Sequence, residues 1–194
     1  MNVDFSRFDN SFYDPGGSRL KRVAWFLVGS PLVRSTILPF SRFRRALLEW
    51  FGARIGEGAV IKPGVRVKYP WNLRAGRNCW IGEDCWIDNL ARVSLGDNVC
   101  LSQDVYLCTG NHDWSDAAFR LTVHPITIGS GAWIAARAAL GPGAQIGEGA
   151  VIALGSVVMG RVPDYEIHGG NPAVFLKRRR IGEPRRSENA GVLR

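Results

Sequence analysis

Aliphatic residues recur every six positions along much of this 194-residue chain, and this spacing restricts the fold more than any other feature. A period of six fits neither the turn of an α-helix, about 3.6 residues, nor the two-residue alternation of a strand. It fits a coil of short strands, in which each side takes six residues and three sides close a turn of eighteen. The runs are Ile55, Ile61, Val67 and Leu73; Ile81 and Ile87 after a two-residue slip; Leu95, Leu101 and Leu107; and Ile128, Ile134, Leu140, Ile146, Ile152 and Val158.

A second column of small or β-branched residues follows four positions after the first, as at Val65, Cys85, Val105, Ala138 and Ser156. Glycine and polar pairs at 57–58, 97–98 and 148–149 suit corners that need unusual backbone angles. The pattern predicts a parallel β-helix whose aliphatic residues stack one coil apart, at a strand spacing of about 4.8 Å. A sandwich or barrel of hairpins would instead alternate with a period of two and turn every ~8–12 residues.

The repeat divides the chain into three parts. Residues 1–53 lack it, and we expect short helices at 19–30 and 41–51, separated by breaks at Pro31 and Pro39, to cover the first coil and its open edge. Residues 54–162 form the β-helix, with a loop leaving it at about 108–127. Residues 163–194 form a final segment with a basic tail.

The net charge of +8 favours anionic partners: a phosphorylated cofactor, a membrane surface or nucleic acid. No nucleic-acid-binding motif is present, and no secretory signal precedes the four cysteines, so we expect a cytoplasmic protein without nucleic acid as partner. Residues 21–40 have two interpretations. Burial against the first coil is favoured, and the alternative is peripheral contact with the inner face of a membrane, anchored by Trp25, Phe26 and flanking cations.

Several segments within residues 54–178 resemble the hexapeptide-repeat acetyltransferases. The segments 128–136 (IGSGAWIAA), 153–158 (ALGSVV) and 170–173 (GNPA) are similar to the parts of that family that contact the coenzyme. Within the family, the chain most resembles the acetyltransferases of colanic acid biosynthesis, through 69–73 (YPWNL), 80–82 (WIG), 86–90 (WIDNL), 102–103 (SQ) and 107–114 (LCTGNHDW).

The resemblance implies a left-handed coil and a homotrimer with active sites between subunits. It implies acetyl-CoA as donor, no metal, and transfer to a hydroxyl of a sugar or lipid-linked saccharide in exopolysaccharide biosynthesis. Residues 80–84 differ from relatives that act on small galactosides, so the identity of the acceptor stays open.

His112 is the candidate general base. It lies on a loop that leaves a rigid scaffold, a place well suited to function, although a lone histidine is more often structural. The resemblance implies that it takes the proton of the acceptor hydroxyl, as an imidazole can near neutral pH. It also implies direct transfer within a ternary complex, with the backbone N–H of Ala136 stabilising the oxyanion.

The remaining candidates divide between the two substrates. The resemblance implies acceptor contacts for Asp88, Asn89, Asn111, Asp113 and Trp114, although residues 88–89 are equally well read as a polar corner, and the neighbouring Asp113 could orient His112. For Lys177 and Arg178 a solvated basic tail is the alternative to contact with the coenzyme phosphates. The coenzyme-binding candidates are Trp133, Ala135, Ala136, Ala153, Gly155, Ser156, Asn171, Pro172, Ala173, Lys177 and Arg178.

Two other functions compete with the transferase. A zinc hydratase on this fold needs three converging histidines, and the spacing of His112, His124 and His168 does not match that family. A non-catalytic β-helical scaffold or binding protein rests on the basic charge alone.

Overall fold

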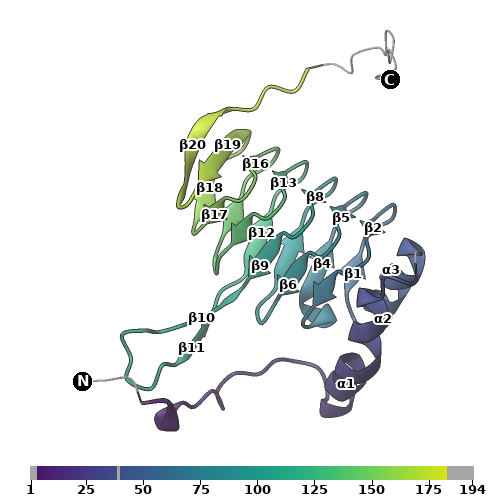
Figure 1. Ribbon diagram of the computed structural model, residues 1–194, viewed down its shortest axis with the longest axis vertical. Coiled ribbons are helices and arrows are strands. Elements are labelled where there is room, and N and C mark those ends of the chain that lie inside the picture. Colours follow the sequence, from purple (N-terminus) through teal and green to yellow (C-terminus); the bar gives the residue numbers. More distant parts are fainter. Residues whose placement is uncertain (1–3, 39, 183–194) are drawn as a thin grey trace.

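The computed structural model describes residues 4–38 and 40–182. The chain winds into a parallel β-helix, with helices at one end and a hairpin projecting from one side (Figure 1). The β-helix predicted from the six-residue repeat is therefore confirmed. The expected break at Pro39 lies outside the described residues.

Three sheets form the sides of the β-helix, and we number them in the order in which the chain visits them. Sheet I contains β1 (Arg54–Ile55), β4 (Leu73–Ala75), β7 (Val93–Leu95), β12 (Ile126–Ile128), β15 (Gln145–Ile146) and β18 (Arg161–Val162). Sheet II contains β2 (Val60–Ile61), β5 (Trp80–Ile81), β8 (Cys100–Leu101), β13 (Trp133–Ile134), β16 (Val151–Ile152), β19 (Glu166–Gly170) and β20 (Ala173–Arg178). Sheet III contains β3 (Arg66–Val67), β6 (Trp86–Asp88), β9 (Tyr106–Cys108), β14 (Ala139–Leu140) and β17 (Val157–Val158).

The core consists of the predicted columns. In sheet II the aliphatic residues Ile61, Ile81, Leu101, Ile134 and Ile152 lie in register one above another and are almost fully buried. Burying one such side chain stabilises the fold by about 1.5–3 kcal/mol relative to leaving it exposed. The small residues of the second column are buried at the corner between sheets II and III: Val65, Cys85, Val105, Ala138 and Ser156.

The corners differ in how much chain they use. From sheet I to II, and from II to III, one inward position follows the last by six residues in every coil, as in Ile128, Ile134 and Leu140. The corner from sheet III back to sheet I varies: the chain uses eight residues from Val67 to Ala75 and from Ile87 to Leu95, 21 from Leu107 to Ile128, and six from Leu140 to Ile146. The first coils therefore exceed the expected eighteen residues, and every extra residue lies at the III–I corner.

The predicted corner residues have the backbone angles that the prediction required. Gly58, Asn98 and Gly149 have φ of 74°, 57° and 60°. These angles lie in the left-handed region that glycine and asparagine adopt most readily.

Helices cover the first coil, as expected (Figure 1). They are α1 (Arg19–Ala24), the π-helical η2 (Trp25–Gly29), α2 (Ser30–Arg34) and α3 (Ser41–Trp50); the 3-10 helices η1 (Phe5–Arg7) and η3 (Pro70–Asn72) complete the set. Ser41 Oγ accepts the Ile61 N–H at 2.8 Å, and the Arg34 carbonyl accepts the Gly64 N–H at 3.2 Å. These bonds satisfy backbone donors at the open edge of the first coil.

The expectation that Pro31 breaks the helix is wrong, because α1, η2 and α2 follow one another without interruption. The Ser30 N–H donates to the Trp25 carbonyl, five residues back. Pro31 then lies at the start of α2, directly after the π-helical segment, so the helix accommodates the proline by a local change of its hydrogen-bond spacing.

Trp25 belongs to the core beneath these helices. It is 3% exposed, its ring packs edge-on against Phe51, and its Nε1 donates to the Val67 carbonyl at 3.2 Å. Burial is thus confirmed for Trp25, and its alternative role as a membrane anchor is wrong. No helix among residues 4–38 and 40–182 combines the length and apolar character needed to cross a membrane.

Two appendages complete the fold. The hairpin of β10 (Gly110–His112) and β11 (Leu121–Val123) leaves the III–I corner after β9, and the segment before α1 returns along it (Figure 1). At the other end, β20 pairs antiparallel with β19 and extends sheet II beyond the last coil.

Candidate functional site

His112 ends β10, and its ring is held in one orientation. Its Nδ1 lies 2.9 Å from the Phe119 carbonyl, and the imidazole stacks on the Phe119 ring, with centroids 4.4 Å apart. A carbonyl only accepts hydrogen bonds, so Nδ1 carries the proton in this contact, and Nε2 is the basic nitrogen, without a partner in the part of the chain that the structure describes. The arrangement is that of a positioned general base.

The neighbours of His112 stabilise the hairpin. Asp113 Oδ1 accepts from the N–H and hydroxyl of Ser115, at 2.9 and 2.5 Å, which lowers the pKa of the Asp113 carboxyl. Asp113 therefore does not orient the imidazole, as its place in the sequence suggested; the Phe119 carbonyl does. Asn111 Oδ1 accepts the His112 N–H at 2.8 Å, and Trp114 is largely exposed.

A pocket of about 500 Å³ opens beside His112. Its walls come from the hairpin, from α1 and the segment before it, and from the turns that follow β3 and β6. Phe8 packs near the imidazole at 5.7 Å, and the Tyr13 hydroxyl donates to the Leu90 carbonyl at 2.8 Å. Burial raises the pKa of Tyr13, so the phenol stays protonated as a donor. The pocket is lined by Phe8, Asn10, Tyr13, Pro15, Arg22, Lys68, Tyr69, Leu90, His112 and Leu121.

Asp88 ends β6 and faces outward, next to this pocket. Lys68 Nζ lies 3.0 Å from its Oδ1, an ion pair that is too poorly aligned to count as a hydrogen bond. The Tyr106 hydroxyl lies 3.5 Å from Oδ2, and burial raises the pKa of that tyrosine. Asp88 Oδ1 is thus buried without a hydrogen-bond donor among the described residues, and its charge is balanced by the Lys68 ammonium.

Asn89 is fully buried, and this corrects its expected acceptor contact. Its Oδ1 accepts the Tyr69 N–H at 2.9 Å, and its Nδ2 donates to the Tyr69 carbonyl at 2.8 Å. Both ends of the amide are thus used to hold the turn before η3. Asn89 is the polar corner that the sequence left open as an alternative.

The candidate oxyanion donor lies at the II–III corner. Ala136 follows Ala135 in the turn between β13 and β14, and no acceptor for its N–H exists among the described residues. Ala135 is buried, and its N–H donates to the Ile152 carbonyl at 2.9 Å within the stack of coils. Trp133, two positions earlier, is partly exposed and donates from Nε1 to Ser102 Oγ at 2.9 Å.

In the next coil Ala153, Gly155 and Ser156 form the same II–III corner, and this turn stacks on the turn that contains Ala136. Gly155 has φ +66°, donates to the Ala136 carbonyl at 2.9 Å, and has open space where a Cβ would lie. Ser156 is buried and its Oγ accepts the Gly170 N–H at 3.1 Å, which ties this corner to the turn that holds Asn171 and Pro172. A long ligand can therefore run along this corner past an exposed backbone.

The final strand carries the basic candidates. Lys177 and Arg178 are exposed at the end of β20, and Arg178 Nη2 lies 3.7 Å from Glu166 Oε1. Ala173, at the start of β20, packs against the core. Arg179, which the sequence reasoning did not select, donates to the carbonyls of Gly131 and Gly149 at 2.9 Å and braces the I–II corner.

One chain does not bring the two candidate catalytic groups together. His112 leaves from the III–I corner, at the carboxyl ends of the sheet III strands, whereas Ala136 lies before the start of such a strand. The candidates thus form two groups: one around His112 and Asp88, the other along the II–III corner. Among residues 4–38 and 40–182, no three His, Cys, Asp or Glu side chains gather as a metal site would require.

Sequence reasoning missed the groups that position His112. Phe119 acts through its carbonyl and ring, and Phe8 and Tyr13 reach the site from the amino-terminal segment. These contacts are not repeated from coil to coil, so the periodic pattern of the sequence does not indicate them. The aromatic residues of the otherwise polar segment 5–13 were the available signal.

Comparison with known proteins gives consistent results. The family of bacterial transferase hexapeptide repeats (six repeats) matches residues 125–160. WcaF of Escherichia coli K12, named as a colanic acid biosynthesis acetyltransferase, is 36% identical over 164 residues, 84% of this chain and 90% of WcaF. A maltose O-acetyltransferase of Clostridium difficile superposes with a TM-score of 0.72 at 26% identity, covering 84% of this chain and 88% of that one. A galactoside acetyltransferase in complex with coenzyme A superposes with a TM-score of 0.66 at 26% identity, covering 82% and 80%.

Proposed function

The chain belongs to the hexapeptide-repeat acetyltransferases, and from that membership we propose that it transfers acetyl from acetyl-CoA to a saccharide hydroxyl. The observation that carries the proposal is the pair of candidate groups described above: a histidine with a free Nε2 beside a pocket, and a corner with an unused backbone N–H. The similarity to WcaF favours exopolysaccharide biosynthesis as the setting, and we propose the cytoplasm as the location.

In the proposed mechanism His112 Nε2 accepts the proton of the acceptor hydroxyl while the Phe119 carbonyl holds Nδ1–H. The hydroxyl oxygen attacks the thioester carbonyl, and the Ala136 N–H donates to the oxyanion that forms. Collapse of this intermediate expels the coenzyme thiolate, which the protonated imidazole reprotonates. Binding both substrates together converts the reaction into an effectively unimolecular step.

The chain's own residues are also suited to the coenzyme. Trp133 offers an apolar flank to the pantetheine arm, and the open backbone at Gly155 allows its close approach. Asn171, Pro172 and Ala173 are proposed to lie near its adenine, and Lys177 and Arg178 near its phosphates. When bound, acetyl-CoA supplies the thioester that is attacked.

We also propose a homotrimer whose active sites lie between subunits. One chain holds His112 and Ala136 at opposite ends of the sheet III strands, and a second copy could place one group opposite the other. The exposed outward tryptophans Trp80 and Trp86 suit such an interface.

Release of free coenzyme A from acetyl-CoA tests the proposed activity. We expect release that depends on an acceptor from a panel of free sugars, nucleotide sugars and lipid-linked saccharides. The mass of the product, larger than the acceptor by one acetyl group, would identify the acceptor. Absence of release with every acceptor, together with absence of acetyl-CoA binding by calorimetry, would leave the scaffold alternative.

We further propose that residues 21–40 contact a membrane surface. The exposed apolar side chains of η2 support this part of the proposal. Phe26, Leu27 and Val28 are exposed there, next to the cations of α1. We expect the protein to float with phosphatidylglycerol vesicles, and the double variant Phe26→Ser/Leu27→Ser to float severalfold less, because two apolar anchors are lost. Ile181→Ser, an exposed apolar residue at the other end of the chain, is the control. Wild-type protein that stays at the bottom of the gradient would exclude this contact.

A further inference from the structure

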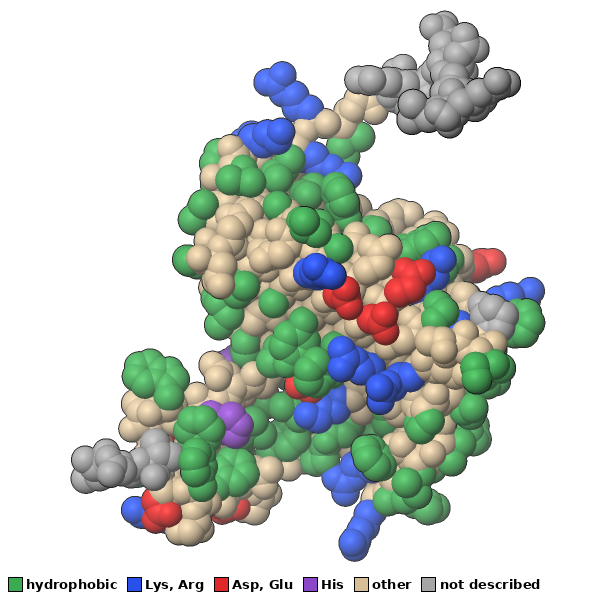
Figure 2. All heavy atoms as spheres, in the orientation of Figure 1, with side chains coloured by type: hydrophobic (Ala, Val, Ile, Leu, Met, Phe, Trp, Pro, Cys, Tyr) green, Lys and Arg blue, Asp and Glu red, His purple; other side chains and the backbone are tan. Residues whose placement is uncertain are grey.

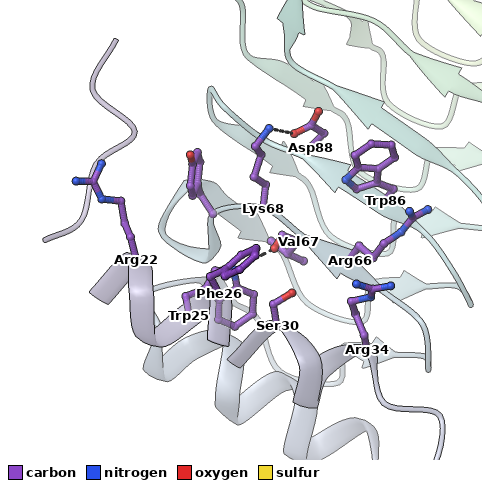
Figure 3. A pocket seen from close by; sticks show the side chains of 11 residues that line it. Arg22, Trp25, Phe26, Ser30, Arg34, Arg66, Val67, Lys68, Trp86 and Asp88 are labelled. Carbon is purple, nitrogen blue, oxygen red and sulfur yellow. Dashed lines mark hydrogen bonds and ion pairs between the residues drawn. The ribbon is translucent and has the colours of Figure 1, made fainter. Parts of the chain in front are cut away.

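A second pocket, of about 410 Å³, lies between the amino-terminal helices and sheet III (Figure 3). Four cationic side chains line it: Arg22 from α1, Arg34 from α2, and Arg66 and Lys68 from β3 and the turn after it. Among the described residues that line it, Asp88 is the single carboxylate. Figure 2 shows a group of blue Lys and Arg side chains in the middle of the face in view, with red acidic side chains beside it.

Most of this positive charge is not neutralised by the protein. Among the described residues, Arg22, Arg34 and Arg66 have no carboxylate within 4.0 Å, and only Lys68 forms an ion pair, with Asp88. Asp84 and Asp104 line an adjoining pocket together with Arg34 and Arg66 but stay beyond that distance. Like charges held close together repel one another, so an entering anion lowers the energy of this group.

The aromatic wall of the pocket orients Arg66. Its guanidinium lies over the ring of Trp86, 4.7 Å from the centroid, and Trp86 stacks on Tyr106 at 4.7 Å. A guanidinium held in this way presents its N–H groups as a fork that matches two oxygens of a phosphate. Figure 3 shows Arg34 and Arg66 on one side of the pocket and Arg22 on the opposite side.

This pocket lies next to the pocket of His112. Arg22, Lys68 and Tyr69 line both, so the two hollows share a wall formed by α1 and the turn after β3. A ligand that fills the cationic pocket therefore lies one wall, formed by Lys68 and Tyr69, away from the pocket of the imidazole.

We propose that the cationic pocket binds a phosphate or diphosphate group of the acceptor, with the saccharide extending toward His112. Four cations against one carboxylate call for an anion with more than one negative charge, which a diphosphate supplies and a single carboxylate does not. The assignment of the saccharide end rests on the proposed acetyl transfer. The anion-binding end does not, because it follows from the pocket alone.

Calorimetric titration without acetyl-CoA tests the anion site separately from catalysis. We expect inorganic pyrophosphate and UDP to bind the wild-type protein and uridine not to bind. Arg34→Gln and Arg66→Gln should each weaken pyrophosphate binding about tenfold or more, since each removes a charge-assisted hydrogen-bond donor. Arg74→Gln is the matched control, because Arg74 is exposed on β4 in sheet I and lines neither pocket. Circular dichroism checks that each variant folds.

The source of the phosphate is distinguished by competition. Displacement of pyrophosphate by short-chain phosphatidylglycerol below its critical micelle concentration, where no vesicle can cover Phe26, would assign the site to a lipid-linked phosphate, and displacement by UDP alone would assign it to a soluble nucleotide sugar. Folded wild-type protein that binds neither pyrophosphate nor UDP would overturn the proposal, as would equal weakening by Arg74→Gln. Pyrophosphate binding without acetyl transfer to any acceptor would count against the proposed function and leave the anion site intact.

Discussion

Replacing His112 by alanine is expected to lower kcat for acetyl transfer by about 10²–10⁴-fold, the usual contribution of a positioned general base. The reason is the loss of Nε2, the nitrogen left free when Nδ1 donates to the Phe119 carbonyl. Steady-state rates of coenzyme A release, measured with the acceptor found in the panel, give the effect. Acetyl-CoA affinity should remain close to that of the wild type, because the coenzyme candidates lie at the II–III corner.

His124→Ala is the control for this prediction. His124 is exposed, directly follows β11, and bonds to the Thr109 carbonyl through its backbone N–H, so the substitution leaves the hairpin intact. Its kcat should stay within about twofold of the wild type, as expected of a surface change away from the reacting groups. Full activity in His112→Ala would remove the histidine from the mechanism and direct attention to Asp88.

Replacing Arg44 by methionine is expected to lower the free energy of unfolding by about 2–4 kcal/mol, because buried carbonyls lose their donor. Arg44 is fully buried in α3 and donates from Nε to the Val33 carbonyl at 3.0 Å and from Nη2 to the carbonyls of Ser35 and Leu38. Burial lowers its pKa, and its Nη1 has no partner among the described residues, so part of the loss is offset when the charge is removed.

Urea unfolding followed by circular dichroism measures this effect. Arg45→Met is the matched control: Arg45 is the next residue in α3, is partly exposed, and pairs with Glu49 at 3.3 Å. A surface pair of this kind contributes about 0–1 kcal/mol, so the control should lose little stability. Equal losses in the two variants would mean that the buried bonds of Arg44 do not hold the turn between α2 and α3.

The repeated contacts were predictable from the sequence, and the contacts made once were not. Six-residue spacing identified the inward columns and the corners with positive φ, because every coil needs inward aliphatic residues and tight corners at the same positions. The spacing placed Leu73 in the first run, but Ala75 is the residue in register with Ile55. Leu73 stacks instead with Val93 and Ile126, which the six-residue spacing did not mark. The return of residues 5–13 to the hairpin was not visible either, because it depends on tertiary contacts such as Asp4 N–H to the Ala117 carbonyl at 3.0 Å.

The site divides in the same way. Motifs identified His112 and the glycine-rich corner, yet adjacency in sequence suggested Asp113 as the orienting group, where the structure uses the Phe119 carbonyl. Residue type alone did not separate Asn89 from Asp88; the alternation of sides, counted from the inward Ile87, places Asp88 outward and Asn89 inward. The cationic pocket joins residues from 22 to 88, a grouping that becomes visible only once the helices pack on sheet III.

The uneven corner lengths bear on how such a chain can change. After the hairpin the chain returns to sheet I at β12 (Ile126–Ile128). This strand pairs in register with β7 (Val93–Leu95) of the preceding coil, so the inserted residues do not shift the pairing. Additions at that corner therefore alter the surroundings of His112 and leave the six-residue spacing along the II–III corner untouched. Acceptor preference and donor chemistry can thus diverge independently, and grafting a hairpin from another acetyltransferase should change which hydroxyl is modified while the same thioester is used.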